Sequence, residues 1–246
     1  MNDPNGAIHY QGHYHLFYQH NPNGAFSASK HWAHVASLDM LRWEEWPVAL
    51  APEPGSYDKD GCFSGFAVVH NGTPTLVYTG VKPQVQCLAT SADGMRTWTK
   101  HPANPVLHAP PPGLEVTGFR DPYAWRGADG LWYILVGSGI RGQGGTALLY
   151  SSPDLVHWTY LNPLVVGRAA ESGRMWNCPA LTPLGGQHVL IVSGQPVWKP
   201  FYMADHFDGR RLTPRSEGLA DYGGNLYAPQ VFIDEGGRAI LWGWIW

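Results

Sequence analysis

The chain has 246 residues, of which 44% are hydrophobic and 14% are charged, and its formal net charge is −3. An average soluble protein carries about 25% charged residues, and the sequence has no basic run that would support nucleic-acid binding. No apolar stretch reaches the length of a membrane span. We therefore expect neither a nucleic-acid partner nor a membrane partner, and we expect no leader peptide within these residues.

Strand patterns dominate the chain from its first residues to its last. The predicted strands are rich in β-branched and aromatic residues and are bounded by Gly, Pro or Asn. No segment sustains a helical period over three turns. In chain order the clearest strands are 13–20, 66–70, 75–80, 131–139, 146–152, 188–194 and 238–246. Together with 30 Gly, 21 Pro and 12 Trp, they predict an all-β protein.

A short unit recurs along these strands, at 37–43, 91–98 and 151–158. Each copy has a Ser, then an Asp, then a Trp four or five positions further on. The Asp residues of successive copies, Asp39, Asp93 and Asp154, are 54 and 61 residues apart. A period of that size with several short strands per unit is typical of propeller blades. We expect the Asp of each unit to cap a turn between two strands of one blade, and the Trp to pack between blades.

The predicted blades begin near Asp3, Ser64, Asp121, Asn177 and Tyr227. After the fifth start only two strand runs remain, whereas a blade has about four strands. The sequence therefore predicts one five-bladed β-propeller domain over 1–246 with an incomplete fifth blade. Because unpaired sheet edges are a liability, either an end-strand arrangement closes the ring unusually or the natural chain continues past the last residue. We expect the second.

Three of these starts pair a polar side chain with a proline: Asn2-Asp3-Pro4, Arg120-Asp121-Pro122 and Asn177-Cys178-Pro179. A proline pushes the preceding residue into an extended conformation, although Asp-Pro is also an ordinary turn starter. Because innermost strands converge on one channel, we expect both Asp carboxylates to face one cavity. Two carboxyl groups about 5–5.5 Å apart are the machinery of retaining glycoside hydrolysis.

The spacing of the cysteines and histidines does not predict a metal or cofactor site. The cysteines at 62, 87 and 178 are isolated, and form neither a zinc pattern nor a disulfide framework. The histidine pairs at 13/15 and 31/34 have no third and fourth ligand at sensible spacing. We expect no metal and no cofactor, and we expect the cysteines to be buried apolar residues.

Seven segments resemble glycoside hydrolase family 32, the fructan-hydrolysing invertase family, in the right order along the whole chain. They are 1–6, 17–22, 31–50, 63–66, 119–122, 175–181 and 221–230. The resemblance implies a five-bladed β-propeller, without the β-sandwich domain that usually follows it. It also implies retaining hydrolysis of β-D-fructofuranosides such as sucrose or fructans.

The same resemblance assigns roles to individual residues. Asp3 matches the nucleophile and Asp121 the transition-state stabiliser, with Arg120 fixing that carboxylate and keeping it ionised. The positions that match the grip on the terminal fructose are Asn2, Gln19, Phe63 and Ser64, and Phe26 stands where the family often has Trp. Gln19 and Ser64 have an alternative role, which is to satisfy strand ends.

The sequence departs from the family at Asn177, where the family has the acid/base Glu, and at Ala180, where it often has Asp. An amide cannot serve as a general acid or base, whose contribution is typically about 10²–10⁴ in rate. We therefore expect either an impaired β-fructofuranosidase or a catalytically silent fructoside-binding propeller. The Asn has three possible origins: engineering, natural loss, or replacement by another carboxyl such as Glu171 or Asp221.

A sialidase-like propeller is a third interpretation, because 91–98 approaches the Asp-box spacing of that fold. Met95 stands where Gly is expected, and no cluster of three arginines is evident. The sequence leaves open the choice among sucrose, inulin, levan and phosphorylated sucrose, and that between hydrolysis and fructosyl transfer. It also leaves the oligomeric state and the compartment open.

Overall fold

The computed structural model describes residues 1–26 and 29–245. Four antiparallel four-stranded sheets and one two-stranded sheet follow one another along the chain. The first contains β1 (Pro4–Tyr10), β2 (His13–His20), β3 (His31–Ser37) and β4 (Glu44–Leu50), and the second contains β5 (Gly61–His70), β6 (Thr73–Val81), β7 (Val85–Thr90) and β8 (Thr99–Lys100). The third contains β9 (Val116–Arg126), β10 (Trp132–Ile140), β11 (Gly144–Ser152) and β12 (Thr159–Val166). The fourth contains β13 (Met175–Leu184), β14 (Gln187–Gln195), β15 (Lys199–Phe207) and β16 (Leu212–Leu219), and the last contains β17 (Leu226–Ile233) and β18 (Ala239–Ile245).

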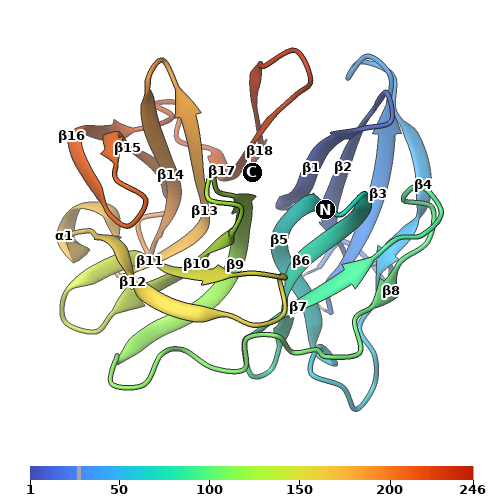
Figure 1. Ribbon diagram of the computed structural model, residues 1–246, viewed down its shortest axis with the longest axis horizontal. Coiled ribbons are helices and arrows are strands. Elements are labelled where there is room, and N and C mark those ends of the chain that lie inside the picture. The colour runs from blue at the N-terminus through green and yellow to red at the C-terminus, as the bar shows by residue number, and fades with distance from the viewer. Residues whose placement is uncertain (27–28, 246) are drawn as a thin grey trace.

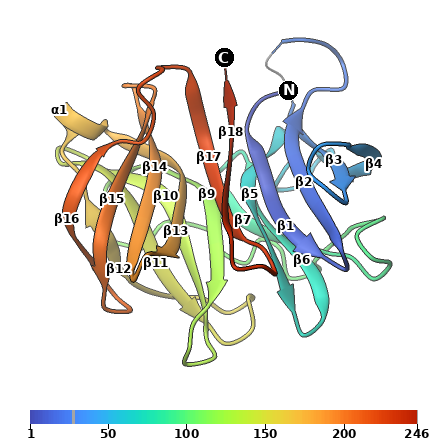
Figure 2. The same ribbon diagram turned by 90° about the horizontal axis from the view of Figure 1, so that it is seen from above.

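The first strand of every sheet lies innermost, and these strands form a closed ring. Strand β1 contacts β5, β5 contacts β9, β9 contacts β13, β13 contacts β17, and β17 returns to β1. Both ribbon views place β17 and β18 between the first and fourth sheets (Figures 1 and 2). The propeller is confirmed with four complete blades, and the two-stranded sheet fills the remaining sector. That the natural protein completes a fifth blade stays a prediction.

The recurring Ser-Asp-Trp unit forms the same turn between the third and fourth strands of three blades. In the first copy the Ser37 hydroxyl donates to Asp39 Oδ1 at 3.1 Å, and that oxygen accepts the backbone N–H groups of residues 41 and 42. The predicted capping role is confirmed. The Trp of the first two units packs across a blade boundary, since Trp43 meets Trp242 with ring centroids 5.6 Å apart, and Trp98 meets Phe17 at the same distance.

Every innermost strand carries a register irregularity near its entry. In three of the five, a residue other than glycine near the bulge adopts a left-handed backbone: Asp121 with φ 59°, Cys178 with φ 47° and Ala228 with φ 48°. This conformation costs an L-residue about 1–2 kcal/mol, and bulges re-aim side chains next to active sites.

Helix is nearly absent from the described residues, where the single helix is α1 (Ala169–Ser172), and none is long and apolar enough to span a membrane. The cysteines at 62, 87 and 178 are free and buried. Among the described histidines, His15 and His34 share a 3.0 Å ring-to-ring hydrogen bond. Within 1–26 and 29–245 no three metal-binding side chains gather in one place.

Candidate active site

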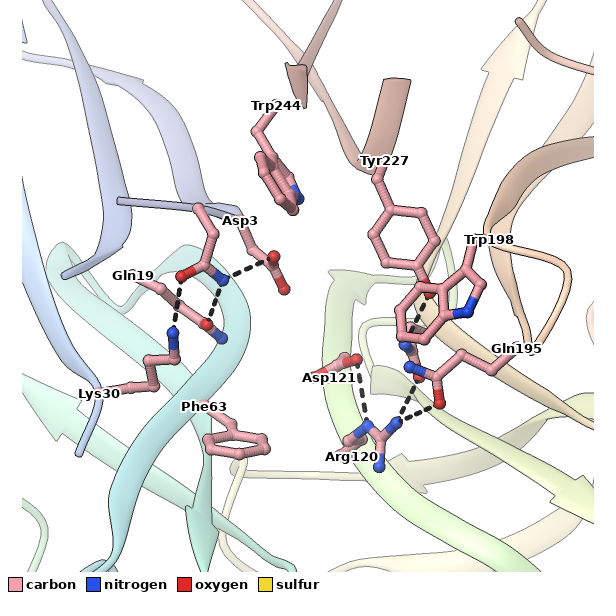
Figure 3. Close-up of a pocket in the computed structure, with 12 residues that line it drawn as sticks. Asp3, Gln19, Lys30, Phe63, Arg120, Asp121, Gln195, Trp198, Tyr227 and Trp244 are labelled. Carbon is pink, nitrogen blue, oxygen red and sulfur yellow. Dashed lines mark hydrogen bonds and ion pairs between the residues drawn. The ribbon is translucent and has the colours of Figure 1, made fainter. Parts of the chain in front are cut away.

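A cavity of about 470 Å³ lies where the innermost strands enter the ring. Figure 3 shows Asp3, Lys30 and Phe63 on one side of it, facing Asp121 and Tyr227 on the other. The two carboxylates come from β9 and from the residue before β1, which are far apart in the chain but join at one space. The lining residues are Asn2, Asp3, Gln19, Lys30, Phe63, Arg120, Asp121, Asn177, Gln195, Trp198, Tyr227 and Trp244.

Hydrogen-bond donors hold the Asp3 carboxylate at the cavity wall. Asn2 Nδ2 donates to its Oδ1 at 2.9 Å, and the hydroxyl of Ser64 donates to its Oδ2 at 2.9 Å. Behind them, Gln19 Nε2 donates to Ser64 Oγ at 2.7 Å, and Lys30 Nζ donates to Asn2 Oδ1 at 2.8 Å. These donors fix the position and orientation of the carboxylate, which a nucleophile needs.

Asp121 is held on the opposite wall by its backbone and by Cys178. Its N–H donates to Thr79 Oγ1 at 2.9 Å, which fixes the left-handed turn. Its Oδ2 accepts the backbone N–H of Cys178 at 3.2 Å and lies 3.8 Å from Arg120 Nε. The Cys178 sulfur lies 3.7 Å from this oxygen and 4.0 Å from Oδ2 of Asp3, so both carboxylates flank one thiol.

Burial raises the pKa of Asp121 to about 6, although the Arg120 guanidinium lowers it; the charge of Asp3 raises it further. The resemblance implied that Arg120 keeps this carboxylate ionised. Arg120 does lower the pKa of Asp121, but a single partner at 3.8 Å does not offset full desolvation. Asp121 is mostly ionised at neutral pH and becomes protonated in mild acid.

We predict that Asp121→Asn stabilises the protein at neutral pH. The folded pKa lies above the unfolded value, so the unfolded chain loses this proton first as the pH rises from about 4 to 6, and stability falls over that window. Above about pH 7 the deficit is constant, on the order of 3 kcal/mol for a shift from 3.8 to about 6. Urea unfolding at pH 4.5 and 7.5 should show a more stable variant at pH 7.5 and a flatter pH dependence. The exposed Asp60→Asn is the control, and a variant that loses stability at pH 7.5 would refute the prediction.

Asn177 is locked by partners on both sides of its amide. Arg120 Nη2 donates to Asn177 Oδ1 at 2.9 Å and to Gln195 Oε1 at 2.9 Å, and Asn177 Nδ2 donates to the hydroxyl of Tyr227 at 3.0 Å. The preceding Trp176 is fully buried against Gly145, where an added Cβ would lie 2.2 Å from the indole. Residue 177 therefore enters the cavity from a rigid strand.

The structure gathers most of the sequence-predicted residues, with two in other places. Ser64 is fully buried behind Asp3 and is absent from the cavity lining, so its contact is with the carboxylate. Phe26 is 62% exposed and lines an adjoining hollow that shares Asn2, Lys30 and Trp244 with the main cavity. Phe26 is therefore not a wall of the main cavity.

The two other candidate acids lie outside the cavity lining. Glu171 on α1 pairs with Arg168, which precedes that helix. Asp221 accepts the backbone N–H groups of Gly223 and Gly224 in the loop before β17. Neither carboxyl replaces the missing Glu within the described lining.

Five lining residues were missed by sequence reasoning: Lys30, Gln195, Trp198, Tyr227 and Trp244. Tyr227 had a usable signal, since it stands at the fifth blade start. Gln195 and Trp198 lie at the β14–β15 connection, whose shape no pattern in the sequence predicts.

Comparison with known proteins identifies relatives over the whole chain. A family model for the glycosyl hydrolases family 32 N-terminal domain matches residues 1–246. The chain is 41% identical over 268 aligned residues to a sucrose-6-phosphate hydrolase of Salmonella typhimurium, covering 100% of this chain and 56% of that protein. It is 36% identical to a raffinose invertase of Escherichia coli, covering 100% of this chain and 54% of that protein. The chain thus spans about half the length of these relatives.

Solved structures give the same result. Fructan 1-exohydrolase IIa from Cichorium intybus matches with a TM-score of 0.87 at 34% identity, covering 100% of this chain and 51% of that one. A variant of the Bombyx mori β-fructofuranosidase, solved with sucrose, matches with a TM-score of 0.87 at 34% identity, covering 100% of this chain and 55% of that one.

Proposed function

Because the chain belongs to glycoside hydrolase family 32, we propose that it is the propeller of a retaining hydrolase of β-D-fructofuranosides in which the acid/base position is silent. One observation carries the proposal. The carboxylates of Asp3 and Asp121 line a single cavity of about 470 Å³, and the sulfur of Cys178 lies near both. Relatives named as sucrose-6-phosphate hydrolase and raffinose invertase support a fructoside ligand. The ligand is sucrose, a phosphorylated sucrose or a fructan.

In the proposed reaction, a carboxylate oxygen of Asp3 attacks C2 of the fructosyl ring. The bond from C2 to the leaving oxygen breaks, and a covalent fructosyl-enzyme forms that water then hydrolyses. Asp121 accepts hydrogen bonds from sugar hydroxyls and opposes the positive charge that develops on the ring. Phe63, Trp198 and Trp244 supply flat apolar surface for the sugar.

Asn177 slows this reaction at its two proton transfers. The leaving oxygen needs a proton in the first step, and the attacking water must lose one in the second. An amide does neither, and no other carboxyl lies in the described lining except Asp3 and Asp121. Ground-state binding does not depend on those transfers, so the chain binds fructosides and turns them over slowly.

Azide rescue tests the proposal on the chain as it stands. With an activated aryl β-fructofuranoside, loss of the leaving group needs little proton donation, and azide replaces water without needing a base. We expect azide to accelerate turnover and to yield β-fructosyl azide, detected by mass spectrometry and NMR. The Asp3→Asn variant is the control and should not be rescued. Absence of rescue in the parent chain would remove Asp3 from the role of nucleophile.

A fructoside-binding propeller without catalysis is the second candidate. The locked hydrogen bonds of Asn177 favour it, because they leave the amide satisfied within the wall. Calorimetric binding of fructose, combined with failure of both azide rescue and carboxylate restoration at 177, would support this candidate over the impaired enzyme.

A further inference from the structure

Arg120 fixes which way the amide of Asn177 faces. A guanidinium has only donors, so the atom of Asn177 that lies 2.9 Å from Arg120 Nη2 must be the carbonyl oxygen. The amide nitrogen therefore faces Tyr227, whose hydroxyl oxygen lies 3.0 Å away. The orientation follows from the chemistry of the partner.

This orientation sets the polarity of Tyr227. Because Asn177 Nδ2 donates, the hydroxyl oxygen of Tyr227 accepts, and the hydrogen of that hydroxyl is left for another acceptor. Among residues 1–26 and 29–245, no acceptor is paired with it, and Tyr227 lines the cavity. Burial raises the pKa of Tyr227 above its ordinary value, so the hydroxyl keeps its hydrogen.

A carboxylate at 177 would reverse this arrangement. Both of its oxygens accept, so Tyr227 would donate to the wall, and its hydrogen would be unavailable to a ligand. With Asn177, the Tyr227 hydroxyl accepts from residue 177 and its hydrogen is left for a ligand in the cavity. With a carboxylate at 177, the hydroxyl would donate that hydrogen to residue 177 instead. This change in the role of Tyr227 follows from replacing one accepting oxygen of residue 177 with a donating nitrogen, and it needs no movement of the Tyr227 ring.

We infer that the Tyr227 hydroxyl donates a hydrogen bond to the exocyclic glycosidic oxygen at C2 of a bound fructofuranoside. The inference rests on the proposed function, in which residue 177 faces that oxygen, and Tyr227 Oη lies 3.0 Å from its side chain. A protonated phenol that retains its hydrogen holds this oxygen without cleaving the bond. Tyr227 is therefore a binding residue of this site, made so by Asn177.

A four-variant cycle tests the inference by calorimetry. The variants combine Asn177 or Asn177→Asp, which has the same length, with Tyr227 or Tyr227→Phe. The ligands are sucrose and 2,5-anhydro-D-mannitol, a furanose analogue without the exocyclic oxygen at C2. With Asn177, Tyr227→Phe should weaken sucrose binding about 3- to 10-fold and leave the analogue unchanged. With Asp at 177, it should change sucrose affinity less than about 2-fold.

The outcomes separate the two proposals. If the parent chain binds neither ligand, the proposed function fails and this inference fails with it. If the parent binds both, and Tyr227→Phe has equal effects in both backgrounds or on both ligands, only the role of Tyr227 is overturned. A crystal structure of the parent with sucrose gives a second readout that does not depend on the folding of the variants. A glycosidic oxygen beyond hydrogen-bond distance of Tyr227 Oη would overturn the inference.

Discussion

Asn177→Glu should raise the rate of sucrose hydrolysis by about 10²- to 10⁴-fold, the typical contribution of a general acid and base. The side chain at 177 lines the cavity, so the longer side chain of Glu can place its carboxyl there. Arg120 remains a hydrogen-bond donor for the new carboxyl. The release of glucose from sucrose at saturating concentration, followed as initial rates, gives the comparison directly.

Asn177→Gln is the matched control, because it has the length of Glu without an ionisable proton. Its rate should stay within a few-fold of the parent rate. A Glu variant that is no faster than the Gln variant, while both bind fructose, would contradict the impaired-enzyme proposal and favour the silent binder.

Asp3→Asn, placed in the Asn177→Glu background, should remove the restored activity by at least about 10⁴-fold. Removing a nucleophile eliminates the covalent intermediate, and loss of a nucleophile costs up to about 10⁶ in other hydrolases. The Asn side chain still accepts from Asn2 or Ser64, so the wall keeps its shape. The variant should therefore lose the hydrolysis rate but bind fructose with an affinity within about 10-fold of that of its Asn177→Glu background.

Asp60→Asn serves as its control, since this carboxylate is exposed just before β5 and outside the cavity. It should keep the full restored rate. Activity that survives Asp3→Asn would mean that another group attacks C2, and the proposed mechanism would be wrong at its first step.

The propeller could be predicted because its signals are local. Strands show themselves by β-branched and aromatic runs, and the Ser-Asp-Trp unit forms a turn from its own side chains, as Ser37 and Asp39 do. The proline motifs mark innermost strands, which a propeller gathers at one end. The carboxylates of Asp3 and Asp121 were expected to share a cavity for that reason, and they do.

Other features depend on neighbours that are distant in sequence. Ser64 was expected at the sugar, but its hydroxyl is used by Asp3, a residue in another blade. The raised pKa of Asp121 follows from its burial and, in smaller part, from the charge of Asp3 in another blade, which no single motif contains. Lys30 and Trp244 reach the cavity from the start of β3 and the end of the chain, and only the closed ring brings them together.

A crystal structure of this chain with sucrose is the most direct test of the central claim, because slow turnover should leave the sugar intact. The account predicts the fructosyl ring between Phe63 and Trp244, with C2 about 3–3.5 Å from a carboxylate oxygen of Asp3, as a near-attack geometry requires. Asp121 should accept hydrogen bonds from the ring hydroxyls. A sugar bound elsewhere, or one whose C2 faces away from Asp3, would contradict it.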